Sequence, residues 1–402
     1  MSKNNLIMKA VGSEYMAQYN ALLRYVFQVT DQELRSVGWQ EAEMIRAKFP
    51  TMEKADVIGW FDDGTLVSQV AVYPMKVRIF GKTYALGGLT GVGTYPEYSN
   101  MGLMHSLLER ALVDMRSKGQ YICYLYPYSI PYYRRKGWEI VSDKISYEIK
   151  DYQLPKNRPV PGNVRRVKTE SEELKRTYER YAMRTHGAIL RDDLAWNEYW
   201  LWDSDDIMAA VYYNEDDEPD GYIIYWIYNE VFHIKDMIFN NEEARTGLWN
   251  FVSAHFSMIT QVEGNTYTDE PLAFLFEDAS IKEVISPYYM ARIVDFTAFI
   301  ADYPFKPDEV DREWKFTMTD PMMACNRGSF LLKIDKDGHG EAVKIDEPCD
   351  DSISIQTMTT MLMGYKRPDY LAKIGRLGAS DDVIDMLEDA IEQQTPYISD
   401  YF

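Results

Sequence analysis

Cysteine and histidine are scarce in this chain, and neither has the spacing of a metal site. The 402 residues contain five histidines and three cysteines, Cys123, Cys325 and Cys349. An odd and sparse set of cysteines excludes a disulfide framework and is typical of a protein of the reduced cytoplasm. Because no two histidines are spaced as HxxxH and the cysteines lack ligand spacing, we expect no metal centre.

Long apolar runs are missing too. The longest ones fall well short of the roughly 20 residues that span a bilayer. The first five residues, Met1-Ser2-Lys3-Asn4-Asn5, lack the apolar core of a secretory signal. We therefore expect a cytoplasmic protein that does not enter a membrane.

Positive charge is in deficit. The chain has 43 basic and 63 acidic residues, a net charge of −20. Nucleic acids and anionic membrane surfaces are polyanions, so both are poor candidates as partners. A cationic small substrate such as a polyamine is compatible with this charge, and so is a solvated acidic surface that only keeps the protein soluble.

What the chain does have is apolar and aromatic side chains, in a pattern of alternating strands and helices. It is 46% hydrophobic and 14% aromatic, and its length suits two or three domains. For the first part we expect strands at 6–10, 56–61, 65–73, 76–80, 84–94, 121–126 and 138–150, and helices at 13–28, near 39–48 and from Gly102. The helix after Gly102 has one apolar stripe that includes Leu103, Leu107, Leu108 and Met115.

The second part repeats this plan in topology. A proline-bearing linker at 151–162 precedes a strand at 164–167, a helix from Ser171, strands at 207–213, 221–228 and 230–239, and a helix at 243–256. Glu242 and Glu243 at the start of that last helix suit the helix dipole but would repel a phosphate. We therefore expect this copy to bind no cofactor.

The third part begins near 290, with strands near 313–319, 328–336, 341–345 and 352–356 and a helix from Asp382. The chain then closes with Tyr397-Ile398-Ser399-Asp400-Tyr401-Phe402. Chain ends are usually polar and frayed. An aromatic end instead indicates a tail that docks into a groove.

The stretch from 89 to 138 is the most informative. A strand at 89–95 leads through a turn to the helix at Gly102, and a strand at 121–126 leads to Tyr132-Tyr133-Arg134-Arg135-Lys136-Gly137-Trp138. A helix start offers unpaired N–H groups to a phosphate. A tyrosine beside the cleft can give a proton to a leaving thiolate. This order of elements is the one in which an acyl-CoA site is built.

These residues, with Val92-Gly93-Thr94-Tyr95-Pro96-Glu97-Tyr98, resemble the GCN5-related N-acetyltransferases (GNATs). Over its whole length the chain resembles the enhanced intracellular survival (Eis) family of that superfamily. The resemblance implies an α+β fold: tandem GNAT-like α/β domains with a mixed, mostly antiparallel, V-shaped sheet, followed by a sterol-carrier-protein-like α+β domain. The expected boundaries are 1–150, 151–288 and 289–402.

The resemblance also implies acetyl-CoA as the donor. Val92, Gly93 and Thr94 would pair with the amides of pantetheine as an added strand would. The turn and helix start would hold the pyrophosphate, and Tyr128 and Ser129 would flank the far wall. The full turn set is Asn100, Met101, Gly102, Leu103, Met104 and His105.

For catalysis the resemblance implies Tyr133 as general acid and the α-carboxylate of Phe402 as general base. Without the resemblance, the plainer interpretation of Tyr133 is a core tyrosine, and that of the aromatic chain end is a tail that fills a groove. Phe27 and Trp39 are candidates for the acceptor wall, and Asp400 and Asp31 could attract a cation. Cys123 has no histidine partner in sequence, which favours direct attack by the amine over a covalent enzyme intermediate.

The chain departs from the family pattern before the helix. Ser99-Asn100-Met101 stands where the family has arginines, and Met104 replaces a small residue. Each lost charge-assisted phosphate contact is worth roughly 1.5–3 kcal/mol. The backbone N–H groups remain, and Arg134 or Arg135 are candidates to compensate.

The sequence therefore favours an N-acetyltransferase that acts on a primary amine, such as an aminoglycoside-like compound, a polyamine or a lysine side chain. Two alternatives stay open: a degenerate GNAT-fold protein that binds an apolar ligand in its third domain, and an acidic interaction scaffold. The resemblance also implies a homo-oligomer, often a hexamer.

Overall fold

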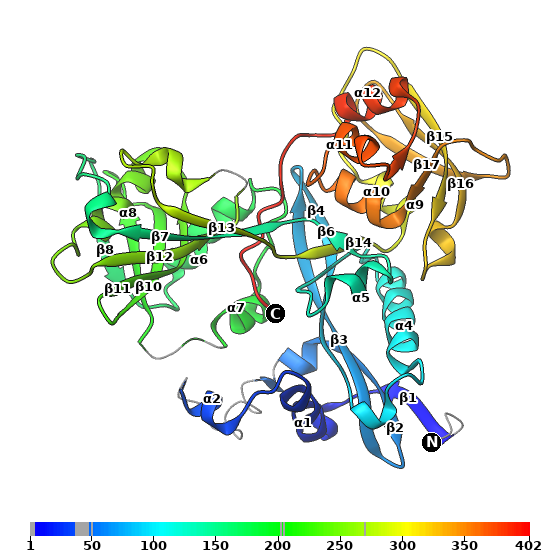
Figure 1. Cartoon of the computed structure of the whole chain (residues 1–402), viewed down its shortest axis with the longest axis horizontal. Helices are drawn as coiled ribbons and strands as arrows, with labels where there is room; N and C mark the ends of the chain where they lie inside the picture. The colour runs from blue at the N-terminus through cyan, green and yellow to red at the C-terminus, as the bar shows by residue number, and fades with distance from the viewer. Residues whose placement is uncertain (1–4, 37–47, 50, 202, 204–205, 269–270) are drawn as a thin grey trace.

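The computed structural model describes residues 5–36, 48–49, 51–201, 203, 206–268 and 271–402, and these residues form three β-sheets with helices against them (Figure 1). Two seven-stranded sheets lie side by side, and a five-stranded sheet packs beside the first. The expected α+β class with two similar halves and a distinct third part is confirmed.

The first sheet is mixed and mostly antiparallel. Its order is β1 (Leu6–Ala10), β2 (Asp56–Asp62), β3 (Thr65–Ile79), β4 (Lys82–Thr94), β5 (Ile122–Leu125), β14 (Met290–Ile293) and β6 (Glu139–Ile140). Only β4 and β5 pair in parallel, across a helix crossover. The strands expected at 65–73 and 76–80 are one continuous strand, since pairing with β4 continues through Pro74 and Met75, where buried and exposed side chains begin to alternate.

The second sheet has the order β13 (Lys282–Pro287), β7 (Asp143–Lys150), β12 (Gln261–Thr266), β11 (Val231–Phe239), β10 (Pro219–Tyr228), β9 (Met208–Tyr213) and β8 (Asn163–Val167). The third has the order β17 (Gly340–Ile345), β16 (Gly328–Ile334), β15 (Arg312–Thr319), β18 (Ser352–Ser354) and β19 (Leu377–Gly378). The strand expected at 352–356 is shorter, because Ser354 caps a helix that begins at Ile355.

The two large sheets are joined by an antiparallel ribbon that runs from one into the other. Residues 139–150 form one side of the ribbon and residues 282–293 the other (Figure 1). Between the sheets Val141 N–H donates to Tyr289 O at 3.0 Å, and Tyr288 N–H donates to Ser142 O at 2.9 Å. The expectation of a single strand at 138–150 in the first sheet is therefore wrong.

Each side of this ribbon changes sheet at its middle. Strand β7 joins the second sheet, and β14 inserts between β5 and β6 of the first. Residues 290–293 thus complete the first sheet and do not open the third part. The domain boundaries expected at 150 and 288 stay a prediction, and strand pairing crosses both.

Helices alternate with these strands along the chain. In the first part these are α1 (Met16–Val26), α2 (Asp31–Ser36), α4 (Leu103–Ser117) and α5 (Ile130–Arg134), and in the second α6 (Glu172–Ala182), α7 (Asp193–Trp200) and α8 (Glu242–Ser253). The third part has α9 (Phe296–Ala301), α10 (Ile355–Leu362), α11 (Pro368–Lys373) and α12 (Asp381–Ala390). Short 3₁₀ turns lie at Ser13–Tyr15, Pro96–Tyr98, Asp151–Gln153, Leu272–Leu275 and Ala324–Asn326.

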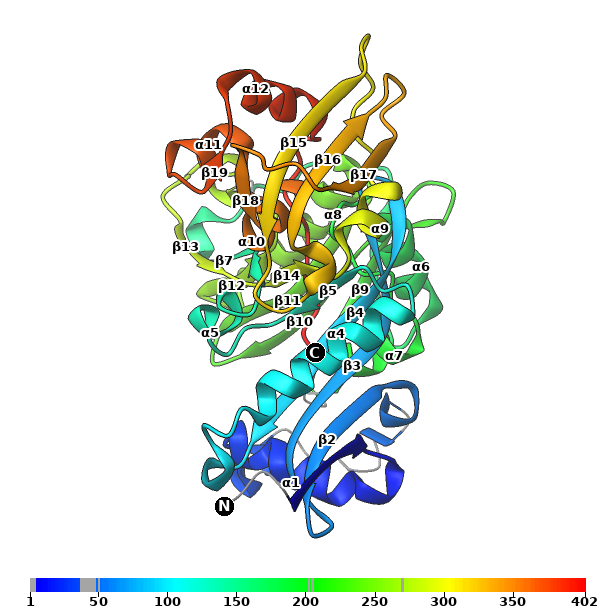
Figure 2. The same ribbon diagram turned by 90° about the vertical axis from the view of Figure 1, so that its right-hand side faces the viewer.

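Helix α4 confirms the apolar stripe read from the sequence. Leu103, Leu107, Leu108, Leu112 and Met115 are all buried against the first sheet, along which the helix runs in Figure 2. Helix α6 starts at Ser171 as expected, and the structure shows this residue as its N-cap, since its hydroxyl accepts from Leu174 N–H at 3.4 Å. The helix expected at 13–28 is shorter, because Ser13–Tyr15 is a 3₁₀ turn and α1 ends at Val26. The helical stretch expected near 39–48 lies mainly outside the described residues.

Among the helices that the structure describes, none combines the length and the apolar character needed to cross a bilayer.

A fully buried ion pair ties the third part to the first. The Arg292 guanidinium contacts both carboxylate oxygens of Asp320 at 2.6 and 2.7 Å, and neither side chain is exposed. A further Arg292 N–H donates to the carbonyl oxygen of Lys136, just after α5. A Cβ at Gly137 would collide with the same guanidinium, so glycine is needed there for this close approach. Arg292 thereby holds the segment that follows α5.

Replacing Asp320 with asparagine should destabilise the protein, because it leaves the Arg292 charge buried without its partner. We expect a loss of about 3–5 kcal/mol at pH 7, measured by urea unfolding. Burial acts to raise the pKa of Asp320, but Arg292 and amide donors hold it below its ordinary value. A depressed carboxyl pKa contributes stability above its unfolded pKa and loses it as the pH falls through the folded pKa.

The difference between Asp320→Asn and the parent should therefore shrink at pH 3 and below. Glu347→Gln, which breaks the exposed pair with Lys315 at 2.8 Å, is the matched control and should change stability little. Equal stability of Asp320→Asn and the parent at pH 7 would contradict the role of the pair.

Candidate active site

The first sheet opens between β4 and β5. The two strands pair over three positions, Leu86–Ile122, Gly87–Cys123 and Gly88–Tyr124. Strand β4 continues to Thr94, whereas β5 ends at Leu125. Gly91 has a left-handed φ of +62°, next to an irregularity in the β3–β4 register, and the Tyr19 hydroxyl lies where a Cβ would be. Within the described residues, the edge of β4 beyond Gly88 that faces β5 has no strand partner.

Neighbouring glycines face opposite sides of this opening. A Cβ on Gly87 would lie 2.6 Å from the sulfur of Met115 in α4, and a Cβ on Gly88 would lie 2.9 Å from Cε2 of Phe402. One face of the opening is therefore covered by α4 and the other by the chain's last residue. We call these the helix face and the tail face.

On the helix face the start of α4 is exposed backbone. Gly102, the N-cap, has φ +73°, and among the described residues no side chain caps the helix. Asn100 is also left-handed, at φ +62°. The first N–H groups of a helix have no intrahelical partner, so those of Leu103, Met104 and His105 can bind an anion.

The backbone of Val92, Gly93 and Thr94 lies on the unpartnered length of β4. Val92 packs in the apolar cluster of the helix face, and Gly93 faces Val26 of α1, whose Cγ2 would lie 3.1 Å from a Cβ there. Thr94 pairs its hydroxyl with that of Ser68 at 2.7 Å. Tyr128 is 80% exposed and Ser129 is the N-cap of α5, so both lie at the end of β5, across the opening.

Three basic side chains at the end of α5 and directly after it have different surroundings. Arg134 pairs at 2.8 Å with Glu139, a buried carboxylate, and Arg135 lines a cleft of about 430 Å³ together with Asp320, Arg327 and Gln356. Lys136 instead reaches the first turn of α4, where its Nζ lies 2.8 Å from Nδ1 of His105. Partial burial and the neighbouring Arg135 lower the pKa of Lys136. Lys136 is thus the cation beside the candidate phosphate site, a placement that the sequence did not indicate.

Tyr133 is buried on the helix face. Its ring is 5.3 Å from that of Tyr132 and 6.0 Å from that of Trp138, in the cluster that contains Cys123 and α4. Burial raises the pKa of the Tyr133 phenol, which keeps it protonated and able to donate. Tyr132, on the same short helix, is half-buried.

Cys123 does not have the surroundings of a nucleophile. Its thiol is fully buried, and burial raises its pKa to about 12. A reactive cysteine needs a stabilised thiolate, which this apolar position disfavours.

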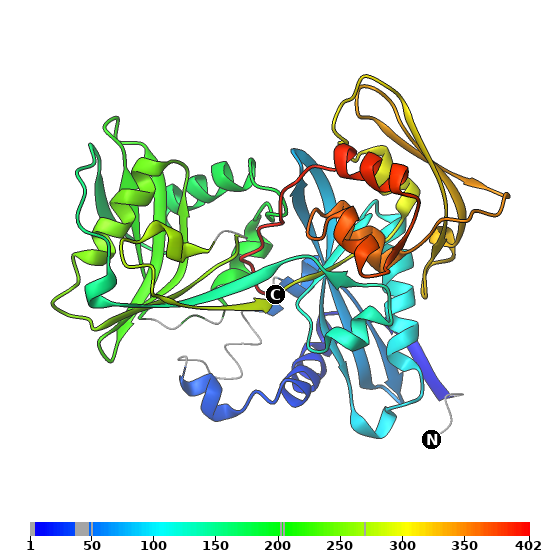
Figure 3. The same ribbon diagram turned by 45° about the horizontal axis from the view of Figure 1, so that its top comes forward.

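On the tail face Phe402 packs among aromatic rings. Its ring is 5.5 Å from that of Tyr289 and 6.3 Å from that of Tyr73. Tyr401 packs at 5.2 Å on Tyr126, directly after β5. The chain end therefore lies at the opening of the sheet, at the centre of Figures 1 and 3.

Asp400 is also at this face, but it is buried. Its carboxylate accepts from Arg191 at 2.7 Å, and its side chain is only 5% exposed. Phe27, at the end of α1, is 46% exposed, and Asp31 pairs with Arg24 at 2.5 Å. Trp39 lies outside the described residues.

The structure adds polar residues at the tail face that the sequence analysis missed. The buried Glu198 of α7 pairs with Lys48 at 2.8 Å, and the Lys48 ammonium lies 3.5 Å from the Tyr73 hydroxyl. Arg191 is a further polar residue of this face that the sequence analysis missed. The one available signal for it was a single arginine directly after the apolar run Ala188-Ile189-Leu190.

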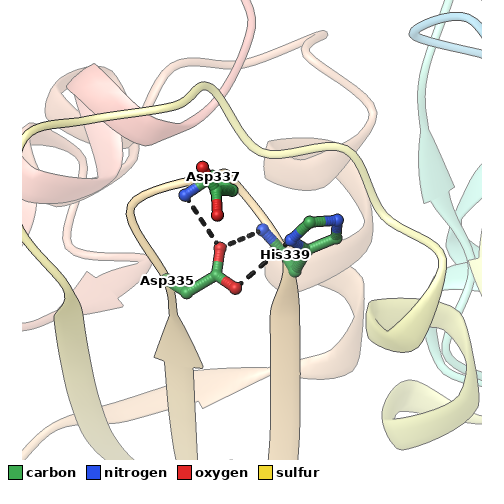
Figure 4. A group of neighbouring side chains, drawn as sticks. All are labelled: Asp335, Asp337 and His339. Atoms are coloured by element: carbon green, nitrogen blue, oxygen red, sulfur yellow. Dashed lines mark hydrogen bonds and ion pairs between the residues drawn. The ribbon is translucent and has the colours of Figure 1, made fainter.

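Three side chains of the types that bind metal ions lie far from this opening, in the turn between β16 and β17. Asp335, Asp337 and His339 are all exposed (Figure 4). One Asp335 oxygen accepts the N–H groups of Asp337 and His339 at 2.9 and 2.8 Å, and the other lies 3.2 Å from the His339 ring. These bonds close the turn, so the group is explained as turn structure.

Comparison with known proteins places the same three parts along the chain. Residues 8–141 match one acetyltransferase (GNAT) domain family, residues 187–293 match a second, and residues 296–399 match a sterol carrier protein domain. No curated protein matches the chain significantly.

Several solved structures superpose over nearly the whole chain. A probable N-acyltransferase of unknown function from Enterococcus faecalis V583 is 25% identical, with a TM-score of 0.89, over 99% of this chain and 100% of that one. A GCN5-related N-acetyltransferase from Anabaena variabilis is 20% identical, with a TM-score of 0.84, over 99% and 100%. Eis1 from Mycobacterium abscessus is 17% identical, with a TM-score of 0.80, over 99% and 100%.

These matches agree with the opened sheet and the exposed start of α4 on the nature of the first part, an acetyltransferase (GNAT) domain. The chain therefore contains two acetyltransferase (GNAT) domains followed by a sterol carrier protein domain, and it shares its overall fold with Eis1 from Mycobacterium abscessus.

Proposed function

We propose that this protein transfers an acetyl group from acetyl-CoA to a primary amine by direct attack of the amine. The observation that carries the proposal is the opening of the first sheet at Gly87 and Gly88, where Met115 of the helix face and Phe402 of the tail face approach adjacent glycines. The helix face presents a buried, protonated Tyr133, and the tail face presents the end of the chain at Phe402. Two proton-handling groups on opposite sides of one opening suit a transfer reaction that runs through it.

The residues present fit acetyl-CoA as the donor. The unpartnered edge of β4 at Val92, Gly93 and Thr94 can accept an extended chain of amides, as a strand edge accepts a peptide. The N–H groups at Leu103, Met104 and His105, with the left-handed Asn100 and Gly102, can hold a pyrophosphate, next to Met101. Tyr128 and Ser129 would close the far side. Acetyl-CoA supplies an acetyl thioester, and the chain supplies orientation and proton transfer.

We assign the two catalytic roles as follows. The α-carboxylate of Phe402 would take the proton that the attacking ammonium must lose, and the Tyr133 hydroxyl would give a proton to the departing sulfur. The apolar surroundings that raise the pKa of the Tyr133 phenol also destabilise a departing thiolate, whose thiol has an ordinary pKa of about 8.5, so a proton can pass between the two groups. The base role requires that position 402 be the chain end in the working protein.

The acceptor would enter at the tail face. Glu198 offers a carboxylate there beside Lys48, and Phe27 and Trp39 stay candidates for its wall. Because Asp400 is buried against Arg191, we assign it to holding the tail and not to attracting the substrate. An aminoglycoside-like amine, a polyamine and a lysine side chain all fit a net charge of −20.

A non-enzymatic role for an apolar ligand in the third part has less support. The inner face of that sheet is packed with aromatic rings, with Trp314 4.1 Å from Phe316 and Phe296 5.4 Å from Phe330. No binding of acetyl-CoA at millimolar concentration would nevertheless favour it over the enzyme.

We further propose that the protein is cytoplasmic and forms a homo-oligomer, with a hexamer as the candidate assembly. Edge strand β13 exposes Val284 and Ile285, and the neighbouring 3₁₀ turn exposes Phe274 and Leu275. An exposed apolar strand edge is usually covered in the working protein.

Tyr133→Phe should lower kcat about 100-fold or more and leave acetyl-CoA affinity nearly unchanged, because it removes only the transferable proton. Thiol release from acetyl-CoA measures the rate, with spermidine, kanamycin and Nα-acetyl-lysine methyl ester as acceptors. Tyr132→Phe, on the same helix, is the matched control. Parental turnover in Tyr133→Phe would show that another group protonates the sulfur.

A chain extended by two glycines beyond Phe402 should lose turnover to a similar degree, because its carboxylate no longer lies at the opening. The same assay measures it, with isothermal titration of acetyl-CoA as the binding check. A matched extension at the N-terminus should leave the rate unchanged. If the C-terminal extension acetylates amines at the parental rate, the carboxylate of Phe402 is not the base.

Lys136→Met should weaken acetyl-CoA binding about tenfold, because it removes the one cation at the first turn of α4 for which the described residues offer a direct contact. Isothermal titration at low and high salt measures it, and the salt dependence should fall in the variant. Lys118→Met, at the other end of α4, is the control. Equal affinity in Lys136→Met would exclude this lysine from the phosphate site.

A further inference from the structure

Residues 396–402, which we call the tail strap, leave the third part and run along the second part to the first. Figures 1 and 3 show the strap passing from α12 between the two large sheets. Its backbone begins with Tyr397 N–H donating to His186 O at 2.8 Å. Its end lies against Gly88 in the first sheet. The strap therefore connects all three parts.

The second part holds the strap with one arginine. Arg191 Nε donates to Asp400 Oδ1 at 2.7 Å, and Arg191 Nη2 donates to Ser399 Oγ at 3.1 Å. The Tyr288 hydroxyl donates to the Asp400 carbonyl oxygen at 2.8 Å, and that of Tyr178 to Asp400 Oδ2 at 3.4 Å. Ser399 and Asp400 of the strap are thus both bound by side chains from elsewhere in the chain.

Arg191 is itself locked in place. Its side chain is fully buried, and its guanidinium carbon lies 3.7 Å from the ring centre of Tyr178, 3.9 Å from that of Tyr199 and 4.7 Å from that of Trp196. All three rings belong to helices α6 and α7 of the second part. A rigid aromatic socket of this kind fixes the direction of the guanidinium.

The Arg191–Asp400 pair also makes docking close to all-or-none. A buried charge costs several kcal/mol unless it is paired, and the carboxylate for Arg191 comes from the strap. Undocking the strap would leave the guanidinium in its aromatic socket without that partner. Phe402 is two positions beyond Asp400, with only Tyr401 between them, a reach of at most about 7 Å. Fixing Asp400 therefore fixes the position of residue 402.

We infer that Arg191 is a positioning residue for acetyl transfer: through Asp400 it holds the strap so that Phe402 lies against Gly88 at the opening of the first sheet. This inference rests on the proposed function for its catalytic meaning. It assigns a task to the second GNAT domain, which becomes the socket for a group that works in the first. The contact is physical and can be tested without any acceptor.

Three variants test it: Arg191→Met, Asp400→Asn and the double variant. Carboxypeptidase A removes aromatic C-terminal residues, and we expect it to release Phe402 and Tyr401 at least tenfold faster from each variant than from the parent. Asp400→Asn keeps the shape of the strap and leaves the second part intact, so it remains informative if Arg191→Met folds poorly. Arg180→Met, which breaks the pair with Asp220 in the same part, is the control and should keep the parental release rate.

Thiol-release kinetics with the three acceptors above supply the catalytic readout. We expect kcat to fall about 100-fold in each variant with an unchanged KM for acetyl-CoA, because a misplacement of about 1 Å has an effect of this size. The double variant should be no worse than either single one, since both remove the same contact. Asp400→Glu, which keeps the charge, should restore part of the turnover lost in Asp400→Asn.

Parental release rates in Arg191→Met and Asp400→Asn would overturn the inference, and so would faster release with unchanged kcat. A chain that ends at Tyr401 separates this failure from a failure of the proposed function. If that shortened chain acetylates amines at the parental rate, the carboxylate of Phe402 is not the base. Protection of the strap in the parent and its loss in Arg191→Met would still be measured independently.

Discussion

The structure depends on the parting of β4 and β5 after three paired residues. A sheet interior that opens leaves backbone N–H and C=O groups without strand partners, so they must pair with water or a ligand, and the parted strands need packing on both faces. Here α4 and Met115 support one face and the ring of Phe402 the other, at the adjacent glycines 87 and 88. Glycine is required at these positions because any side chain would displace one of the two supports. The opening is thus maintained by elements from both ends of the chain.

Two buried ion pairs set the position of these supports. Arg292 with Asp320 holds the segment after α5 from the third part, and Arg191 with Asp400 ties the tail to the second part. Burying such pairs contributes little net stability compared with apolar residues of the same size. Their value lies in geometry, since each guanidinium binds a carboxylate and a second partner, Ser399 for Arg191 and the carbonyl of Lys136 for Arg292, which fixes direction as well as distance. Each flanking part thereby controls one face of the opening in the first part.

Local features of the fold could be predicted from the sequence, and long-range pairings could not. The stripe of α4 and the start of α6 at Ser171 depend on neighbours three or four residues away, and both predictions are confirmed. Within 138–150 the polar run 142–144 interrupts the alternation of side chains where the chain changes sheet, but nothing local in that interruption shows which strand each half pairs with. The same limit applies to Asp400. An acidic residue near a chain end looks exposed, and only its contact with Arg191, 209 positions away, reveals it as buried.

The second GNAT domain shows how a repeated fold changes its task. At the start of its helix α8, Asn241 caps the N–H of Ala244 at 2.8 Å, and the Tyr212 hydroxyl contacts Glu243 at 2.5 Å. A Cβ on Gly247 would collide with the Tyr212 ring, so this ring occupies the helix surface. In the first domain the corresponding helix start exposes backbone N–H groups. One copy thus presents donors to a ligand, and the other satisfies its donors internally and uses its opposite side to hold a chain end. In this second copy the aromatic socket around Arg191 contacts the tail through Asp400.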